Sequence, residues 1–372
     1  MKIGITCQPS TGGSGIMATE LGMALARRGH EVHFVTTERP FRLSEFQPRV
    51  ISHTVDVVSY PLFSDPPVSL ALAAKISEVA EENGVELWHA HYAMPNAVCA
   101  LLAREMLAPK QRFKIVTTLH GTDITLVGSD PSFFRITKYA MEASDAVTAV
   151  SHWLREETLR EFQLERPVET IYNFIDDGKF PPQAPERCTL AEEGEKIVMH
   201  ISNFRPVKRV TDVVRVFKRV LEHIDARLVM VGDGPERMSA VGVAKQLGIT
   251  DKIKYIGTHV DIATILPCAD LIIQPSEHES FGLVPLEAMA CEVPVLASNS
   301  GGITEVVEHG VTGYLADVGD IDTMAKHAVE VLSHGDLAKM MGRRGRERAV
   351  FHFGRDKIVP QYEALYERVT RG

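Results

Sequence analysis

Two glutamates eight positions apart give the strongest chemical signal in this chain of 372 residues. Glu279 and Glu287 frame the segment ESFGLVPLE, in which Gly282 frees the backbone and Pro285 suits the first turn of a helix. Carboxylates are rarely buried unpaired, and the backbone amides at the start of a helix attract anions. The segment is therefore predicted to hold hydroxyl-rich and anionic parts of one ligand.

A cluster of cations stands out in a chain whose formal net charge is −9. Arg205, Lys208 and Arg209 lie in SNFRPVKRV, directly after a predicted strand. Arginine forks onto phosphate or carboxylate oxygens, and lysine acts as a point charge. Cations at a helix N-terminus oppose the helix dipole by ~0.3–1 kcal/mol, so a bound anion would relieve the conflict. The alternative is a solvated basic helix start.

Histidines follow two other predicted strands. His120 lies in TLHGTDIT, at a strand-to-loop exit where ligand-binding residues are common, although a structural histidine is an equal alternative. His89 and His91 alternate on one strand and must face the same side of it. A zinc site would need further ligands at suitable spacing, so a buried or cleft-lining pair is favoured. Tyr92 follows the strand and could line a cleft.

Glycine-rich loops follow two more strands. The loop QPSTGGSG, 8–15, precedes a helix and could cradle phosphate, although a tight turn is the plain alternative. It is neither GxGxxG nor a P-loop, which argues against a dinucleotide-binding dehydrogenase. VGDGPE, with Gly232, and the later pair Gly301 and Gly302 are weak signals that could be turns alone.

The elements that must position these residues alternate between strand and helix. The predicted strands of the first half are Lys2–Cys7, Glu31–Thr36, Val55–Tyr60, Leu87–His91, Lys114–Leu119, Ala146–Val150 and Val168–Tyr172. Helical periodicity lies between several of them, as in Met17–Arg28 and Leu70–Glu82. Strands rich in Val and Ile and separated by helices indicate a parallel sheet covered on both faces.

The same alternation restarts after a stretch with three prolines, 176–195, which is predicted to be a linker. The second set of strands is Ile197–Ile201, Arg227–Val231, Lys252–Ile256, Leu271–Gln274 and Pro294–Ala297, and Asp356–Val369 forms an amphipathic helix. The predicted fold class is α/β, with two Rossmann-like doubly wound domains, 1–175 and 196–354, facing each other across a cleft. Ligands of such sheets bind at the carboxyl ends of the strands.

Composition excludes several classes of protein. A net charge of −9 argues against a general nucleic-acid binder, and no apolar run reaches the ~20 residues of a membrane span. Met1 leads into a strand-like segment, so no signal peptide is expected. The five cysteines are scattered without a CxxC pair, which makes a disulfide framework or zinc site improbable and a reducing cytoplasm the expected location.

Taken together, these segments resemble the retaining, nucleotide-sugar-dependent glycosyltransferases of family 4, which have the GT-B fold. The matching pieces, in order along nearly the whole chain, are GGSG, HGTD, FRPVKR, VGDGPE, ESFGLVPLEAMA and the run from Gly301 to Tyr314. TLHGTDIT, IYNFID and HISNFRPVKRV look closer still to the N-acetylglucosaminyl L-malate synthases of bacillithiol biosynthesis. Transferases that act on inositol phosphate, epimerases of the same fold and sugar-binding proteins without activity are the alternatives.

The resemblance implies roles for particular residues. Glu287 would hold the ribose hydroxyls, Glu279 the hydroxyls of the donor sugar, and Arg205 and Lys208 the diphosphate. His120 would bind the donor sugar, which makes His120, Arg205, Lys208 and Glu279 the implied catalytic set. Further donor-binding positions would be Gly13, Ser14, Gly15, Gly232, Ser280, Phe281, Gly282 and Leu283. The implied acceptor-binding positions are Ser14, Tyr92, Thr118, Asn173 and Arg205.

The same resemblance implies partners and two departures. The substrates would be a UDP-sugar and a small dicarboxylate, with no cofactor and no divalent metal, and the question of a homo-oligomer stays open. The final helix, 355–372, would cross back to the first domain. Asn203 replaces an arginine common in the family, so Arg205 is expected to supply that cation. Glu292 replaces a common glycine, at a cost of roughly 1 kcal/mol if its backbone is left-handed.

Overall fold

The computed structural model of this chain describes residues 1–9, 12–43, 46–57, 65–109, 112–182, 189–259 and 261–372. The chain divides into two compact units. Unit 1 comprises Met1–Asn173 and Asp356–Gly372, and unit 2 comprises Phe174–Arg355. The stretch 176–195 lies within unit 2, and most of the C-terminal helix belongs to unit 1.

Unit 1 is built on a seven-stranded parallel sheet with the strand order β3-β2-β1-β4-β5-β6-β7. Its strands are β1 (Lys2–Thr6), β2 (Glu31–Thr36), β3 (Val50–Thr54), β4 (Leu87–His91), β5 (Lys114–Leu119), β6 (Ala146–Ala149) and β7 (Val168–Thr170). Its helices are α1 (Gly13–Arg27), α2 (Val68–Asn83), α3 (Val98–Leu107), α4 (Thr122–Thr125), α5 (Phe134–Ala143), α6 (His152–Phe162) and α13 (Arg355–Arg371).

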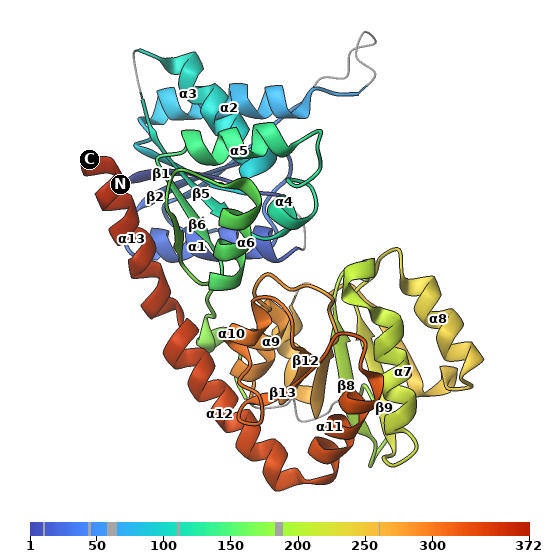
Figure 1. The fold of residues 1–372 in the computed structure, drawn as a ribbon. Coiled ribbons are helices and arrows are strands. Elements are labelled where there is room, and N and C mark those ends of the chain that lie inside the picture. Colours follow the sequence, from blue (N-terminus) through green and yellow to red (C-terminus); the bar gives the residue numbers. More distant parts are fainter. Residues whose placement is uncertain (10–11, 44–45, 58–64, 110–111, 183–188, 260) are drawn as a thin grey trace. The chain divides into compact units, whose positions relative to one another are not determined.

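Alternation along β4 assigns its side chains to the two faces of this sheet. Trp88 packs with α2, α3 and α5 in one apolar cluster. His89 faces the opposite side, where the hydroxyl of Tyr366 on α13 lies 2.6 Å from its Nδ1. Figure 1 shows α2, α3 and α5 together and α13, in red, along the first unit. The C-terminal helix thus completes the cover of a sheet formed by the start of the chain.

Unit 2 repeats the plan with a six-stranded parallel sheet in the order β10-β9-β8-β11-β12-β13. Its strands are β8 (Lys196–Ile201), β9 (Ala226–Val231), β10 (Ile253–Gly257), β11 (Leu271–Gln274), β12 (Val295–Ser298) and β13 (Gly313–Ala316). Its helices are α7 (Val210–Val220), α8 (Arg237–Gln246), α9 (Leu283–Ala290), α10 (Ile303–Val306), α11 (Ile321–Ser333) and α12 (Gly335–Phe353).

Each sheet has one point at which the strand order reverses. In unit 1 the reversal lies between β1 and β4, and in unit 2 between β8 and β11. Loops that leave two such neighbouring strands in opposite directions open a crevice at their carboxyl ends, where ligands of this architecture bind. The GGSG loop follows β1, Tyr92 follows β4, the cationic segment follows β8, and Glu279 follows β11. These predicted site residues therefore lie at the two reversal points, whereas His120 follows β5 and Gly232 follows β9, each one strand away.

Several sequence predictions need correction or completion. The predicted strand Val55–Tyr60 is wrong, because 55–57 are not in a strand and 58–60 lie outside the described residues. The actual strand, β3 (Val50–Thr54), lies at the edge of the sheet and is largely exposed, so it lacks the apolar run that marks a buried strand. Strand β13 was not predicted at all.

Two local features bear on earlier expectations. Glu292 has φ 61°, so the condition for its strain is met. Cys7, Cys99 and Cys291 are free, whereas Cys268 is disulfide-bonded, which the scattered spacing gave no reason to expect. Among the described residues, no helix is both long and apolar enough to cross a membrane.

Candidate active site

The reversal point of unit 2 is marked by an ion pair between Lys208 and Glu279. The Lys208 Nζ lies 2.6 Å from the Glu279 Oε2, and each side chain is 20% exposed. The Ser276 hydroxyl is 3.4 Å from the same oxygen. Lys208 follows β8 and Glu279 follows β11, 71 residues later. Two residues predicted separately from the sequence therefore meet at one point.

The backbone around Glu279 is held by the glycine pair after β12. The Gly302 amide donates to the Glu279 carbonyl at 2.7 Å. A Cβ on Gly301, whose φ is 74°, would lie 2.3 Å from that carbonyl oxygen. Only glycine fits such an approach, so this pair, which could have been a simple loop, fixes the segment that carries Glu279.

Helix α9 begins directly after Glu279 and Ser280. Gly282 is its N-cap residue, with φ 100°, and no side chain caps the helix start. The first backbone amides of a helix have no partner within the helix and attract anions, so this helix start is suited to a phosphate group. Glu287 lies on the same helix and is 5% exposed. Burial of the Cys291 thiol raises its pKa to about 12, and the nearby Glu287 charge contributes to this rise.

The three cations after β8 differ in their surroundings. Arg209 pairs with Asp212 in the first turn of α7, with 2.6 Å between the Arg209 Nε and the Asp212 Oδ2. The Asp212 carboxylate interacts favourably with the positive end of the helix dipole and so offsets the unfavourable effect expected of the cations there. Arg205 is exposed, and Lys208 turns to Glu279. Of the cations predicted to bind the diphosphate, Lys208 is thus brought to Glu279, while Arg205 stays at the surface of unit 2.

Gly232 has a structural reason to be glycine. Its φ is 118°, and a Cβ there would lie 1.8 Å from the Ser202 carbonyl oxygen. Its amide donates to the Gly257 carbonyl at 2.7 Å. The close approach of two loops explains the residue without a ligand.

In unit 1, the loop that carries His120 is fastened by Asp123. The amides of His120 and Gly121 donate to the Asp123 Oδ1 at 3.1 and 3.0 Å, and the Ala93 amide donates to Oδ2 at 3.1 Å. One carboxylate therefore ties the loop after β5 to the turn after β4. Burial raises the pKa of Asp123 to about 6, against the lowering effect of these amides.

The His120 ring lies against two residues from the end of β4. A hydrogen bond of 2.9 Å joins the His120 Nε2 to the His91 Nδ1, and the ring centroids are 5.1 Å apart. The Tyr92 ring meets His120 edge-on at 5.4 Å. Burial lowers the pKa of His120 to about 3 and that of His91 well below its ordinary value. Both imidazoles are therefore neutral near pH 7.

A buried polar network lies next to the His91 and His120 rings, on the interior side of unit 1. The His89 and His91 ring centroids are 4.3 Å apart, so the sequence prediction that they share one face is confirmed. His89 Nε2 is 2.7 Å from the Thr118 Oγ1, which is 2.7 Å from the Thr148 Oγ1. Thr118 is fully buried, so its hydroxyl faces the interior of unit 1 and is not presented to an acceptor. Tyr366 closes the network from α13.

The remaining predicted residues of unit 1 follow two other strands of the same sheet: Gly13, Ser14 and Gly15 come after β1, and Asn173 comes after β7. Gly13, Ser14 and Gly15 form the first turn of α1, which has no side-chain cap and no acidic residue in that turn. Ser14 and Asn173 are each 6% exposed. Residues 10–11 of the preceding loop lie outside the described residues.

Sequence reasoning missed several side chains that contact the predicted residues of unit 1. His91 was predicted only as one of a buried pair, Asp123 only as a neighbour of His120, and neither Thr148 nor Tyr366 was considered. Strand alternation placed His91 on the correct face, and its position at the end of β4 was the signal that it could reach the loop after β5. No local pattern could have linked Tyr366 to His89.

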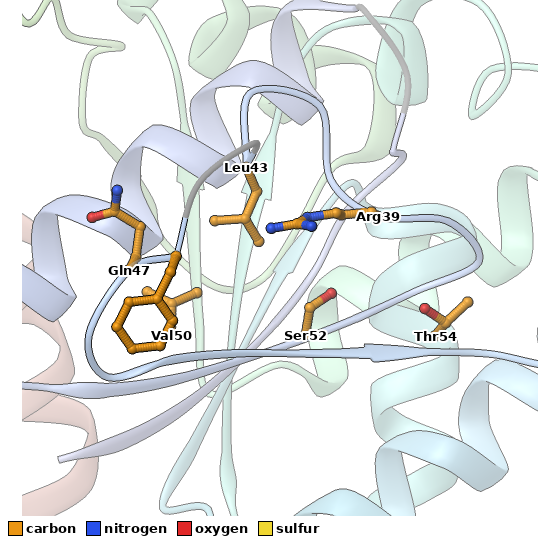
Figure 2. A pocket seen from close by; sticks show the side chains of 7 residues that line it. Arg39, Leu43, Gln47, Val50, Ser52 and Thr54 are labelled. Carbon is orange, nitrogen blue, oxygen red and sulfur yellow. The ribbon is translucent and has the colours of Figure 1, made fainter.

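A separate hollow of about 360 Å³ lies in unit 1, between the loop after β2 and one face of β3. Figure 2 shows Arg39 and Leu43 above Ser52 and Thr54, which project from the strand. The remaining lining residues are Phe46, Gln47 and Val50. None of these lining residues is one that the sequence predicted for the site.

Comparison with known proteins places the chain in a family. Two family models match it, Glycosyltransferase Family 4 over residues 11–179 and Glycosyl transferases group 1 over residues 186–348. The N-acetyl-alpha-D-glucosaminyl L-malate synthase of Bacillus anthracis is 48% identical over 375 residues, covering 100% of this chain and 98% of the relative. This chain belongs to the family-4 glycosyltransferases. The sequence-based resemblance is thereby confirmed.

Solved structures agree on the fold of this glycosyltransferase. Sucrose-phosphate synthase from Thermosynechococcus elongatus has a TM-score of 0.83 and 23% identity, with 99% of both chains covered. Alr3699/HepE of Anabaena, solved in complex with UDP and glucose, has a TM-score of 0.84 and 21% identity, also with 99% of both chains covered. At this level of identity the likeness shows the GT-B fold alone, which confirms the predicted fold class.

Proposed function

We propose that this glycosyltransferase transfers N-acetylglucosamine from UDP-N-acetylglucosamine to the hydroxyl of L-malate, with retention at the anomeric carbon. The observation that carries the proposal is the 48% identity, end to end, with a protein named for that product. The product would be the first intermediate of bacillithiol biosynthesis.

The donor is proposed to bind at the reversal point of unit 2. The buried carboxylate of Glu287 accepts both ribose hydroxyls, because a carboxylate offers two acceptor oxygens. Glu279, held by the Gly302 amide, accepts hydroxyls of the sugar. The amides from Ser280 to Leu283 and the cations Arg205 and Lys208 receive the diphosphate. Glycines 13 and 15, with Ser14, supply further amides from the start of α1, and Gly232 shapes the neighbouring loop.

The chemistry is proposed to run through the leaving group. The bond between the anomeric carbon and the UDP oxygen breaks, and the malate hydroxyl oxygen bonds to that carbon on the same face. The hydroxyl proton passes to the departing phosphate. Lys208, Arg205 and the α9 amides are preorganised positive groups, and such groups stabilise the charge that develops on UDP. They supply this charge without a divalent ion, so activity is expected to survive EDTA.

His120 is proposed to bind the transferred sugar rather than to act as a base. Its pKa of about 3, lowered by burial, makes the imidazole a poor proton acceptor near neutral pH. The malate dianion is assigned to Arg205, and Ser14, Tyr92 and Asn173 are proposed as the acceptor-binding residues of unit 1. Thr118 contributes indirectly, because its hydroxyl holds His89 beneath the pair.

The deciding experiment is an acceptor screen with UDP release as the readout. UDP-N-acetylglucosamine with L-malate should release UDP, and the same mixture with EDTA should do so at an unchanged rate. Release with inositol phosphate but not with malate would show the wrong acceptor. UDP release that needs only water and is not increased by either acceptor would favour an epimerase-like reaction and end the proposal.

A further inference from the structure

The His91 and His120 pair has only one way to share its proton that leaves no buried N–H without an acceptor. Both rings are neutral near pH 7, so each carries one N–H and one lone pair. The hydrogen bond between the His91 Nδ1 and the His120 Nε2 needs a proton on one of these two atoms. The choice is decided by the other nitrogen of each ring.

The far nitrogen of His91 is enclosed. Its Nε2 is buried and has no hydrogen-bond partner among the described residues. If His120 donated the shared proton, His91 would carry its own proton on that enclosed Nε2. Orphaned buried N–H groups are rarer than under-satisfied acceptors in folded proteins. The proton therefore sits on the His91 Nδ1, and His91 donates to His120.

The far nitrogen of His120 is not enclosed. Its Nδ1 has no hydrogen bond among the described residues and is not one of the buried unpartnered atoms there, so it reaches the surface of unit 1. Because His120 accepts at Nε2, its own proton must be on this Nδ1.

We infer that His91 is a positioning residue that locks His120 in its Nδ1–H tautomer, so that His120 presents a hydrogen-bond donor to a hydroxyl oxygen of the transferred sugar. The inference rests on the proposed function for the identity of that sugar. The tautomer itself follows from this chain's own contacts.

The supporting layer is built to keep the pair fixed. The His91 ring contacts both His89 and His120, with ring centroids 4.3 Å and 5.1 Å away. The Asn96 amide donates to the His91 carbonyl at 2.5 Å, and Asp123 holds the His120 backbone. Neither ring can turn without breaking these contacts, so a single tautomer is presented at the surface.

The first test observes the tautomer directly. Protein labelled with ¹⁵N-histidine is assigned by long-range ¹H–¹⁵N correlation near pH 7, using His91 and His120 variants to identify the signals. We expect His120 and His91 both to be protonated on Nδ1 and bare on Nε2. A His120 protonated on Nε2 would overturn the inference, whether or not the protein turns over malate.

The second test separates positioning from packing. His91→Asn keeps an N–H near the Nδ1 position, whereas His91→Leu fills the space without a donor. We expect His91→Asn to keep the donor kcat/KM within about threefold and His91→Leu to lose about tenfold, mainly through the donor KM. In His91→Leu the His120 signals should shift toward the other tautomer. Equal losses in the two variants would overturn the inference.

A matched control lies in the same unit. His33 and His53 form another pair, with 3.0 Å between the His33 Nδ1 and the His53 Nε2 and ring centroids 5.3 Å apart. His33→Leu should lower the melting temperature but leave the donor KM within twofold. A similar rise in donor KM there would show that loss of stability alone explains the His91 result. If the wild type releases no UDP with malate, the proposed function fails while the ¹⁵N spectrum still decides the tautomer.

Discussion

The two reversal points have the same topology and opposite chemistry. In unit 2 the loops after β8 and β11 bring together full charges, Lys208 and Glu279, both partly exposed. In unit 1 the end of β4, at the reversal point, and the loop after the adjacent strand β5 bring together neutral rings, His91 and His120, with burial keeping them uncharged. The same topology thus presents charged side chains in unit 2 and neutral ones in unit 1.

The difference matches what a sugar transfer demands of each surface. A leaving diphosphate gains negative charge as its bond breaks, and fixed positive groups stabilise that change. A sugar with neutral hydroxyls needs oriented donors and acceptors instead, and neutral histidine supplies one of each. If the proposed roles hold, charge belongs to unit 2 and orientation to unit 1, and each prediction below tests that division.

The largest effect is expected from removing the charge at the unit 2 reversal point. Lys208→Met should lower kcat by about 100- to 1,000-fold, the cost of losing one preorganised group at a developing charge. Steady-state UDP release measures it. Lys196→Met is the matched control, because Lys196 starts the same strand and forms a 2.9 Å ion pair with Asp270 at its other end. A kcat that falls equally in both variants would mean that the charge matters only for stability.

The next effect concerns donor binding on α9. Glu287→Ala should raise the donor KM by about 30- to 150-fold, equivalent to ~2–3 kcal/mol for charged hydrogen bonds to hydroxyls. The malate KM should change little, and kcat less than the donor KM. Glu277→Ala, an exposed carboxylate in the same loop region, serves as the control. An unchanged donor KM would remove Glu287 from the ribose role.

Acid should weaken unit 1 more steeply than unit 2. Burial lowers the pKa of His89 and His120 to about 3 and that of His91 well below 6.5, while Asp123 is raised from 3.8 to about 6. Below pH 6.5 the unfolded chain binds about three protons at these histidines that the native chain does not bind. The native Asp123 carboxyl binds one proton that the unfolded chain does not, so the net difference is about two protons. In unit 2 only His200, at about 4, is a comparable histidine among the described residues.

The sign follows from the proton difference. The free energy of unfolding decreases as the pH is lowered wherever the unfolded state binds more protons, by about 1.4 kcal/mol per pH unit for each proton. Between pH 6 and 5 we therefore expect the free energy of unfolding of unit 1 to fall about twice as steeply with acid as that of unit 2. Trp88 and Trp153 are the two tryptophans of the chain and both belong to unit 1, so their fluorescence follows that unit. Urea unfolding is followed by tryptophan fluorescence and by far-UV circular dichroism. If the two transitions coincided at every pH, the prediction would be contradicted.

The sequence predicted the buried strands, and which candidate residues follow them, more completely than the contacts between those residues. Leu87–His91, Lys114–Leu119 and Leu271–Gln274 were predicted to the residue, because each contains a short apolar stretch of the kind that marks a buried strand. The exposed edge strand β3 carries no such run and was misplaced. Parallel topology brings strand ends to one edge, which is why Glu279 and His120 could be singled out.

Pairings across long separations could not be predicted. Lys208 and Glu279 are 71 residues apart, and His89 and Tyr366 are 277 apart. Nothing in either local segment specifies the partner, since the contact depends on strand order and on the return of α13 to the first sheet. The tautomer of His120 depends on a buried atom of His91 and is therefore a property of packing alone.

The smallest predicted effect tests whether backbone strain is part of the difference between the units. Glu292 follows α9 with φ 61°, and Gln163 follows α6 of unit 1 with φ 47°. Replacement of either by glycine should raise the free energy of unfolding of its own unit by roughly 1 kcal/mol, because glycine adopts this conformation without a Cβ clash. Urea denaturation measures both changes. Glu156→Gly, within α6, should have the opposite sign, since glycine in a helix interior costs about 0.5–1 kcal/mol. A gain at Gln163 without one at Glu292 would indicate that the Glu292 side chain makes a compensating interaction in unit 2.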